Sequence, residues 1–296
     1  MNYQHGFHAG NHGDVLKHVV LVELLHLLTA KPAALAYLDS HAGAGRYSLD
    51  SEQAGRTGEW QAGIGRLPGF APGAPAAAGD DHEPDAVPEV VARYLALVQA
   101  SSKGAHGRTY PGSPALAAAL LREQDRLRLC ELQPAIAKVL ERGLAARDRR
   151  IQVFQADGYQ HALKALLPPP ERRGLILVDP PYESRDEFAR SVAALATALT
   201  RFATGVYVLW YPIKQASGVA PLLRDLARLP AKSSLTLELW PRACDSPLRM
   251  NGSGVAILNP PWGFADGIDH WLPWLADRLA DGRGAGCQWR WLKRED

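Results

Sequence analysis

The chain has 296 residues, of which 47% are hydrophobic, and its formal net charge is +2. This length and composition indicate a soluble protein with a full-sized core, built as one large domain or as a domain with an insertion. The small net charge gives no argument for nucleic acid by itself, although a near-neutral total can contain a local basic patch.

Targeting segments are not expected. The first residues contain no apolar stretch that could serve as a signal sequence. The most apolar run, residues 19–28, is interrupted by Glu23 and His26 and is too short to span a bilayer. The three cysteines are far apart and form no C-x-x-C pair, so neither a disulfide framework nor a zinc knuckle is expected. These features favour a cytoplasmic protein.

The hydrophobic pattern predicts alternating helices and strands. Asp14 can cap a helix over residues 15–28, and Pro32 follows that helix. Seven strands are expected, over residues 35–39, 127–131, 151–154, 174–178, 205–210, 234–239 and 255–258. Helices are expected between most of them, over residues 114–125, 135–147, 159–167 and 187–202. This order predicts a doubly wound α/β fold, with a mostly parallel seven-stranded sheet and a closing antiparallel pair.

The interval between the first two strands is too long for an ordinary crossover, so we expect an insertion there. Within it, residues 68–88 are mostly Pro, Ala and Gly and predict a disordered or loose loop. Apolar residues from Val90 to Val98 then recur at helical spacing. The predicted organisation is a main domain of residues 1–52 and 109–296, with residues 53–108 as a helical insertion subdomain.

Acids and glycines stand at the carboxyl ends of the expected strands, where open parallel sheets bind ligands. Gly43 and Gly45 follow the first strand, but Ser48 occupies the third position of a G-x-G-x-x-G pattern, so a nicotinamide or flavin fingerprint is incomplete. Glu131 ends the second strand and suits the ribose hydroxyls of a dinucleotide or an adenosyl cofactor. Asp157 follows the third strand and suits an adenine amino group.

The fourth strand ends in Asp179-Pro180-Pro181-Tyr182, which favours methyl transfer to the exocyclic amine of a base. Such an amine is a poor nucleophile because its lone pair is delocalised into the ring. An Asp179 oxygen and the Pro180 carbonyl, held rigidly by the prolines, can accept both amine hydrogens and direct the lone pair at an electrophilic methyl group. Tyr182 can stack on a flipped base, a contact worth roughly 1 to 3 kcal/mol.

The motif has a second copy, Asn259-Pro260-Pro261-Trp262. Asn-Pro-Pro-aromatic is also a working form of the amine clamp. Asn259 follows the last expected strand, however, at the far side of the sheet from the cofactor acids. We therefore expect Asp179 to be the catalytic copy.

Several segments resemble the RlmJ family, bacterial 23S ribosomal RNA adenine-N6 methyltransferases that depend on S-adenosylmethionine. In chain order they are YQHGFHAGNHGDVLKH, YLDSHAGAGRY, YPGSP, CELQP, ADGY, GLILVDPPYE, LWYP and NPPW. The resemblance implies a Rossmann-like class I methyltransferase fold and transfer of a methyl group to N6 of a specific adenine in 23S rRNA. The expected partner is 23S rRNA that is protein-free or part of an early assembly intermediate. A monomer is expected, because RNA supplies the large partner surface.

The resemblance further implies roles for particular residues. Asp179 is the expected catalytic acceptor, together with Pro180 and Tyr182. The cofactor is expected to contact His18, His41, Gly43, Ser113, Glu131, Asp157, Gly158 and Asp179. Tyr3 is expected to contact the RNA substrate, as is Tyr182.

Simpler interpretations compete for some of these residues. Ser113, which precedes Pro114, is a favourable helix cap. His5, His8, His12 and His18 suggest a metal site, but no acid or cysteine pattern completes a ligand set, and methyl transfer from a sulfonium needs no metal, so none is expected. The arginine clusters at residues 147–150 and 172–173 are typical of solvated charges at the ends of elements.

Two other functions remain open. A DNA adenine-N6 methyltransferase would carry similar motifs, although no separate DNA-reading domain is evident. A catalytically silent RNA-binding protein with the same fold is the alternative from another class. The intact Asp179 motif and the full set of cofactor acids argue against it.

Overall fold

A central sheet of eight strands organises the protein. The computed structural model describes residues 4–70, 86–102, 107–246 and 249–295. The strands of the sheet are β1 (Ala36–Asp39), β4 (Arg126–Cys130), β5 (Ile151–Phe154), β6 (Gly174–Val178), β7 (Val206–Ile213), β8 (Ser234–Trp240), β9 (Gly252–Leu258) and β10 (Gly286–Lys293). Their order is β10-β8-β9-β7-β6-β1-β4-β5. The expected strand pattern is confirmed, but the expected count of seven is wrong.

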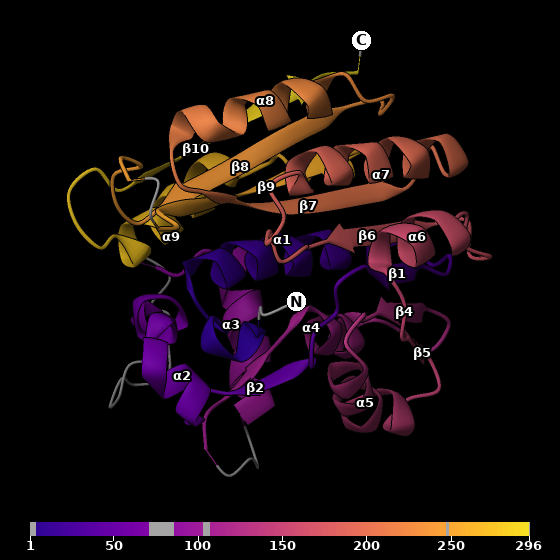
Figure 1. The fold of residues 1–296 in the computed structure, drawn as a ribbon, viewed down its shortest axis with the longest axis horizontal. Helices are drawn as coiled ribbons and strands as arrows, with labels where there is room; N and C mark the ends of the chain where they lie inside the picture. Colours follow the sequence, from indigo (N-terminus) through magenta and orange to yellow (C-terminus); the bar gives the residue numbers. More distant parts are fainter. Residues whose placement is uncertain (1–3, 71–85, 103–106, 247–248, 296) are drawn as a thin grey trace.

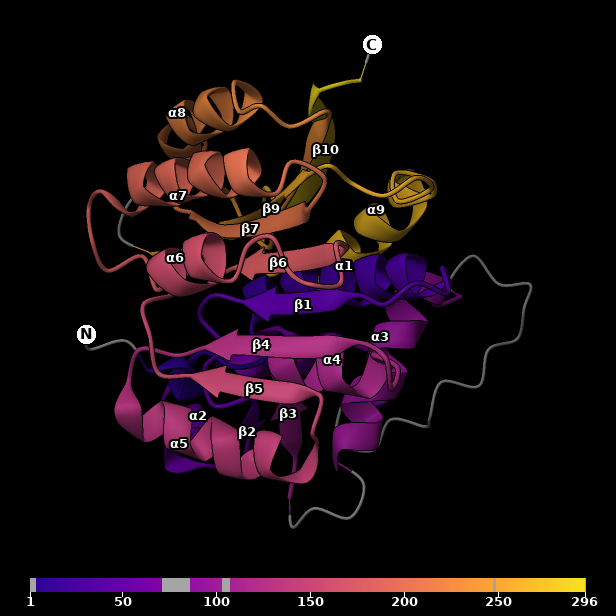
Figure 2. The same ribbon diagram turned by 90° about the vertical axis from the view of Figure 1, so that its right-hand side faces the viewer.

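The parallel half of the sheet contains β5, β4, β1, β6 and β7, and in Figure 2 the arrows of β6, β1, β4 and β5 point the same way. The expected antiparallel pair is β8 and β9, and β9 lies between β8 and β7. The additional strand, β10, pairs antiparallel with β8 at the edge of the sheet.

Helices cover both faces of the sheet (Figures 1 and 2). One face carries α1 (His12–Thr29), α4 (Ser113–Leu120), α5 (Pro134–Gly143) and α9 (Ile268–Leu279). The other carries α6 (Gly158–Gln160) with the π-helical turn His161–Ala165, α7 (Glu187–Arg201) and α8 (Ala216–Ala227). Each face has its own cluster of buried apolar side chains, as expected for a doubly wound sheet.

The segment between β1 and α4 contains the insertion predicted at residues 53–108, and here the name insertion covers residues 46–111. It folds against the first of these faces. It begins with β2 (Arg46–Ser48), α2 (Glu52–Thr57) and the 3-10 turns Glu59–Ala62 and Ile64–Arg66, and it ends with α3 (Glu89–Ser102) and β3 (Thr109–Pro111). β2 and β3 pair as a separate antiparallel ribbon. The expected amphipathic helix is α3, whose buried Val91, Tyr94, Leu95 and Val98 join the core. Most of the Pro/Ala-rich stretch lies outside the described residues.

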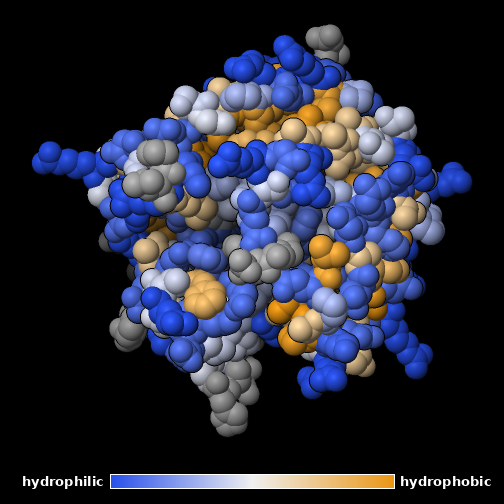
Figure 3. All heavy atoms as spheres, in the orientation of Figure 1, coloured by the Kyte–Doolittle hydropathy of each residue, from blue (hydrophilic) through white to orange (hydrophobic). Residues whose placement is uncertain are grey.

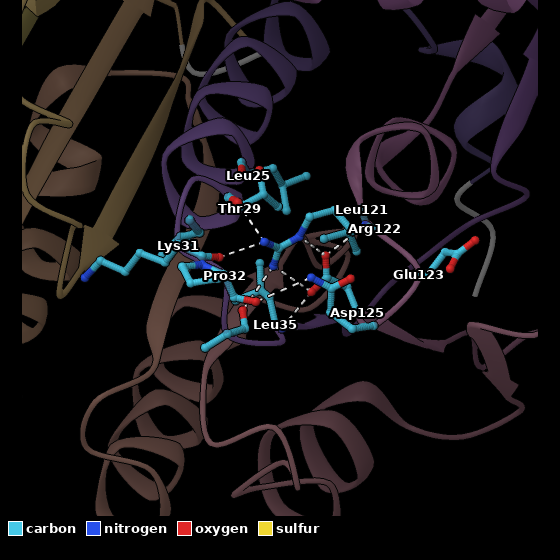
Figure 4. Close-up of polar contacts among 12 residues, drawn as sticks. Leu25, Thr29, Lys31, Pro32, Leu35, Leu121, Arg122, Glu123 and Asp125 are labelled. Atoms are coloured by element: carbon cyan, nitrogen blue, oxygen red, sulfur yellow. Dashed lines mark hydrogen bonds and ion pairs between the residues drawn. The ribbon is translucent and has the colours of Figure 1, made fainter.

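Helix α1 is buried along most of its length. It begins one turn earlier than expected, because Asn11 rather than Asp14 is the cap and accepts a hydrogen bond from the Asp14 amide at 3.0 Å. At its other end, Arg122 donates to the carbonyls of Thr29 and Lys31, as Figure 4 shows. Arg122 also pairs with the buried Asp125. These contacts satisfy carbonyl oxygens that a helix end leaves unpaired.

Candidate functional site

Four of the parallel strands, β1, β4, β5 and β6, end at one cavity of about 720 Å³. It lies on the face of the molecule drawn in Figure 3, whose hollowed centre is surrounded largely by hydrophilic side chains. The predicted residues that line it are His18, His41, Gly43, Ser113, Glu131, Asp157, Gly158, Asp179 and Pro180. Tyr182 is absent from this lining, and Tyr3 lies outside the described residues. Sequence segments far apart in the chain therefore meet at one site.

An ion-pair chain connects Asp179 to the start of α1. The Lys17 ammonium lies 2.5 Å from Asp179 Oδ2 and 2.7 Å from Asp14 Oδ1. Burial alone would lower the pKa of Lys17, but the two carboxylates outweigh it and raise that pKa above its usual range. Burial would raise the pKa of Asp14, but the charges of His5 and Lys17 hold it well below the ordinary value. The site therefore contains a fixed positive charge beside the proposed amine acceptor.

Sequence reasoning missed the role of Lys17. Its position in the middle of an apolar helix was visible, since Leu16 and Val19 flank it within a buried run. A lysine is almost never buried unless it is paired. This signal could have marked Lys17 as the partner of a carboxylate, although not of Asp179 in particular.

A second buried carboxylate, Asp39, stands at the end of β1 beneath the glycine loop. It accepts hydrogen bonds from the hydroxyls of Tyr37 and Ser113, each at 2.7 Å, and from the His41 amide at 3.2 Å. Burial raises the pKa of Asp39 to about 6, although these hydrogen bonds act in the opposite direction. The competing interpretation of Ser113 as a helix cap is wrong, because Gly112 is the cap of α4 and the Ser113 hydroxyl donates to Asp39.

The glycine loop and Glu131 form one unit. Gly43 has a φ of +62°, a backbone conformation that favours glycine, and its amide donates to Glu131 Oε2 at 3.0 Å. The other carboxylate oxygen of Glu131 accepts from the Gln133 amide at 2.8 Å. A carboxylate has about four acceptor positions, so Glu131 keeps capacity for ligand hydroxyls that enter the cavity.

Gly158 permits a close approach between two strand ends. A Cβ atom at this position would lie 1.8 Å from the carbonyl oxygen of Ser40, in the turn that follows β1. Next to it, Asp157 caps α6 by accepting a hydrogen bond from the Gln160 amide at 3.1 Å. The absence of a side chain at Gly158 therefore sets how closely the β5 end packs on the β1 end.

The predicted histidines are held neutral. Burial lowers the pKa of His18 to about 3 and that of His41 to about 4. His18 Nδ1 lies 2.8 Å from the Tyr110 hydroxyl, whereas its buried Nε2 has no hydrogen-bond partner among the residues that the structure describes. His41 Nδ1 lies 2.7 Å from the Ser40 hydroxyl. His18 therefore offers a neutral ring nitrogen at the cavity wall.

The crowded histidines near the start of the chain are distributed among separate partners. His5 pairs with Asp14, and His8 with Glu59. His12 is buried, and burial lowers its pKa to about 4. Within residues 4–70, 86–102, 107–246 and 249–295, no group of three His, Cys, Asp or Glu side chains is placed to hold a metal ion.

Tyr182 packs against the neighbouring strand and helix. Its hydroxyl donates to the Trp210 carbonyl at 2.5 Å. Its ring centroid lies 5.8 Å from that of Trp210 and 5.3 Å from that of Phe188. Tyr182 has a φ of +51°, so the backbone turns sharply after the two prolines. The side chain is partly exposed beside the cavity.

The second copy of the motif lies at the opposite edge of the sheet. β9 runs antiparallel to β7, so the carboxyl end of β9 lies beside the amino end of β7. Asn259 donates to the carbonyls of Ala203 and Gly205 and accepts from the Lys232 amide. Trp262 is 94% exposed. Asn259 therefore ties loops together and is far from the acids of the cavity, as the sequence predicted.

No helix in the described part of the chain combines the length and the apolar character that crossing a lipid bilayer requires. Comparisons with known proteins agree with one another. A family model described as "Ribosomal RNA large subunit methyltransferase D, RlmJ" matches residues 32–293. A protein of Escherichia coli (strain K12) named ribosomal RNA large subunit methyltransferase J is 39% identical over 295 residues, which is 100% of each chain.

Two further relatives extend this agreement. A protein of the same name from Haemophilus influenzae is 38% identical over 287 residues, 96% of each chain. The crystal structure of protein LPL1258 from Legionella pneumophila superposes with a TM-score of 0.80 at 32% identity, covering 97% of this chain and 98% of that one. The expected Rossmann-like class I methyltransferase fold is confirmed, and the chain belongs to the RlmJ family of ribosomal RNA large subunit methyltransferases.

Proposed function

We propose that this protein transfers a methyl group from S-adenosylmethionine to N6 of a specific adenine in 23S rRNA. The observation that carries the proposal is the shared cavity, in which Asp179 and Pro180 at the end of β6 face the acids at the ends of β4 and β5. Membership of the RlmJ family supports the acceptor, because the curated relatives are named as methyltransferases of large-subunit ribosomal RNA.

The residues of the cavity fit an adenosyl cofactor. Glu131 has acceptor capacity for ribose hydroxyls, and Asp157 can accept from an adenine amino group. Leu132 and Ile136 supply apolar side chains beside Glu131 for the faces of the purine ring. The unpartnered Nε2 of His18 is a buried polar atom whose hydrogen bond a ligand can complete. When bound, S-adenosylmethionine supplies a methyl group made electrophilic by its sulfonium.

Asp179 and Pro180 would prepare the acceptor amine. Asp179 Oδ1, the oxygen that does not bind Lys17, and the carbonyl of Pro180 can accept the two amine hydrogens, which directs the nitrogen lone pair toward the methyl group. The methylated nitrogen is acidic and loses its proton readily, so Asp179 need only be a weak acceptor. Lys17 holds Asp179 Oδ2 and thereby fixes the orientation of the carboxylate. Positioning of this kind accounts for most of the expected rate enhancement.

The RNA would reach the cavity from the side of the chain start. Gln4, His5 and Gly6 line the cavity, and Tyr3 immediately precedes them in the sequence. A contact of Tyr3 with RNA, and stacking of Tyr182 on the flipped adenine, are both parts of the proposal. We further propose that the enzyme acts in the cytoplasm as a monomer on protein-free rRNA or an early assembly intermediate, because RNA supplies a large partner surface.

The proposal can be tested by transfer of labelled methyl from S-adenosylmethionine into three acceptors: protein-free 23S rRNA, assembled large subunits and duplex DNA. The RNA acceptors come from cells that lack the enzyme, so that the target is unmethylated, and the modified nucleoside is identified by mass. The expected product is N6-methyladenosine in naked rRNA. Label only in DNA would overturn the RNA acceptor, and cofactor binding without label in any acceptor would overturn the proposed acceptors and favour the silent binding protein.

A further inference from the structure

The arginine cluster at residues 147–150 separates into two kinds of side chain. Arg150 is structural, because it pairs with Asp148 and donates to the carbonyls of Leu121 and Ala118. Arg147 and Arg149 are both exposed. Neither has an acidic partner within 4 Å among the residues that the structure describes. Arg149 fits the expected role of a solvated charge at the end of an element. Arg147 differs from it because its side chain lines a groove.

Arg147 lines a second groove, of about 680 Å³, between the insertion and the end of α5. Ala115 and Ala118 of α4 also line it, and their small side chains leave it open. On the insertion side it is bounded by Ser101 of α3 and Thr109 of β3. Figure 1 shows β2 and α5 as neighbours on the side of the molecule below the N-terminus.

The charges that face this groove are predominantly positive. Arg46 lines it opposite Arg147, and Arg46 donates to the Ser101 hydroxyl at 2.9 Å. The acid at the groove, Asp148, is already neutralised by Arg150, and the arginine side chain lowers the pKa of that carboxyl. Two arginines and two hydroxyls therefore face the groove without a competing free carboxylate among the described lining residues.

Arg46 connects the groove to the catalytic cavity, because it lines both. When a nucleotide is flipped into the cavity, the nucleotides before and after it in the RNA stay outside. The phosphate groups that join them to the flipped nucleotide therefore lie close to the cavity. The planar guanidinium of arginine binds phosphate oxygens in pairs, and hydroxyl groups add further donors. The arginines and hydroxyl groups of the groove can therefore bind the phosphate groups of an RNA backbone that runs beside the cavity.

We propose that this groove binds backbone phosphates of the single-stranded RNA segment that flanks the target adenine, with Arg147 as a phosphate contact. The inference rests on the proposed function and deepens it, since it assigns the path of the substrate away from the catalytic cavity. The groove makes no base-specific contacts in this assignment. Its role is to position the RNA, while recognition of the target belongs to other contacts.

The test compares Arg147→Gln with Arg149→Gln in methyl transfer to protein-free 23S rRNA. Both variants lose one exposed positive charge, two residues apart, and only the first alters the groove. For Arg147→Gln we expect the KM for RNA to rise about tenfold, the loss of one hydrogen bond to a charged group, with kcat and cofactor affinity unchanged. The slope of log KM against log salt should fall by about 0.7, the value for one contact to single-stranded phosphate.

Arg147→Lys should recover most of the affinity, since it keeps the charge. An equal rise in KM for the glutamine variants at 147 and 149 would show that only the general charge matters and would overturn the proposed groove. No rise in either would overturn it as well. Failure of the wild-type protein to methylate rRNA at all would instead overturn the proposed function, so the two failures are distinguishable.

Discussion

Lys17 Nζ and Asp179 Oδ2 lie 2.5 Å apart, although 162 residues separate them in the chain. The pair connects the first helix of the protein to the turn after β6. Because Lys17 also binds Asp14, the ammonium is held from two sides and cannot follow Asp179 freely. The orientation of the proposed amine acceptor therefore depends on how α1 is packed.

Asp179→Ala is expected to abolish methyl transfer, with kcat falling at least about 100-fold, because the amine loses an acceptor that orients it in the transition state. The matched control is Asn259→Ala. It should leave kcat unchanged but lower the free energy of unfolding by about 1 to 3 kcal/mol, since carbonyls at the other edge of the sheet lose their donor. The measurements are single-turnover methyl transfer and urea unfolding. Retained activity in Asp179→Ala, with loss in Asn259→Ala, would reverse the assignment of the two motifs.

Lys17→Met is expected to destabilise the protein by about 3 to 5 kcal/mol, because it leaves two carboxylates close together without their shared cation. Methyl transfer by the folded fraction should fall as well, because Asp179 loses the group that orients it. Lys232→Met is the control, since the pair of Lys232 with Glu295 is exposed and should contribute no more than about 1 kcal/mol. Equal unfolding midpoints for the two variants would show that the buried ion-pair chain adds no stability.

Much of the site was predictable because strand ends carry a strong signal. A buried apolar run followed by an acid places that acid at the ligand edge of a parallel sheet. This signal predicted the positions of Glu131, Asp157 and Asp179, which line one cavity in the structure. Lys17 required the tertiary structure, because its partner Asp179 comes from a distant segment. Asp39 also ends a buried apolar run, but its hydrogen bond with Ser113 comes from a distant segment as well. The geometry of Tyr182 also depends on such a contact, with Trp210 of the next strand.

Three elements, α8, α9 and β10, were not predicted from the sequence, and the cause can be named for each. Helices α8 and α9 contain Pro221 and Pro273, which read as helix breakers although both helices continue past them. β10 is an edge strand whose apolar residues alternate with polar ones, as in Trp289-Arg290-Trp291. Alternation of apolar and polar residues is typical of a strand that is buried on one face, so this pattern would have predicted the eighth strand.

Gly158→Ala should weaken cofactor binding and destabilise the fold by about 1 to 3 kcal/mol, because the new Cβ meets the Ser40 backbone rather than a flexible side chain. Gly143→Ala is the matched control, since a Cβ there meets nothing within 4 Å and the residue lies in α5. The control should be neutral or more stable by up to about 1 kcal/mol. Calorimetric titration with S-adenosylmethionine and thermal unfolding distinguish the variants, and a silent Gly158→Ala would contradict the close approach of β5 to β1.

Asp39 should make stability depend on pH. Its pKa is raised from 3.8 to about 6 in the folded protein, so the folded state holds this proton more tightly than the unfolded state does. Its contribution is therefore most favourable below about pH 4, declines as pH rises toward 6, and above pH 6 amounts to a cost of about 3 kcal/mol. The stability of Asp39→Asn relative to wild type should accordingly rise between pH 4 and 6 and stay level above. A pH-independent difference in urea unfolding would contradict the raised pKa.

Arg122→Gln should lower the free energy of unfolding by about 2 to 4 kcal/mol. The substitution removes the cation that pairs with the buried Asp125, which keeps only main-chain donors, and the donor to the carbonyls at the end of α1. This cluster lies at the amino edge of β1 and β4, opposite the cavity that contains Asp179, so kcat and cofactor affinity should be unchanged. Arg228→Gln removes the same group from an exposed pair with Asp225 and should change stability by less than about 1 kcal/mol. Urea unfolding of both variants at neutral pH provides the measurement. If Arg122→Gln unfolded like the control, the end of α1 would be held by its apolar contacts rather than by the arginine.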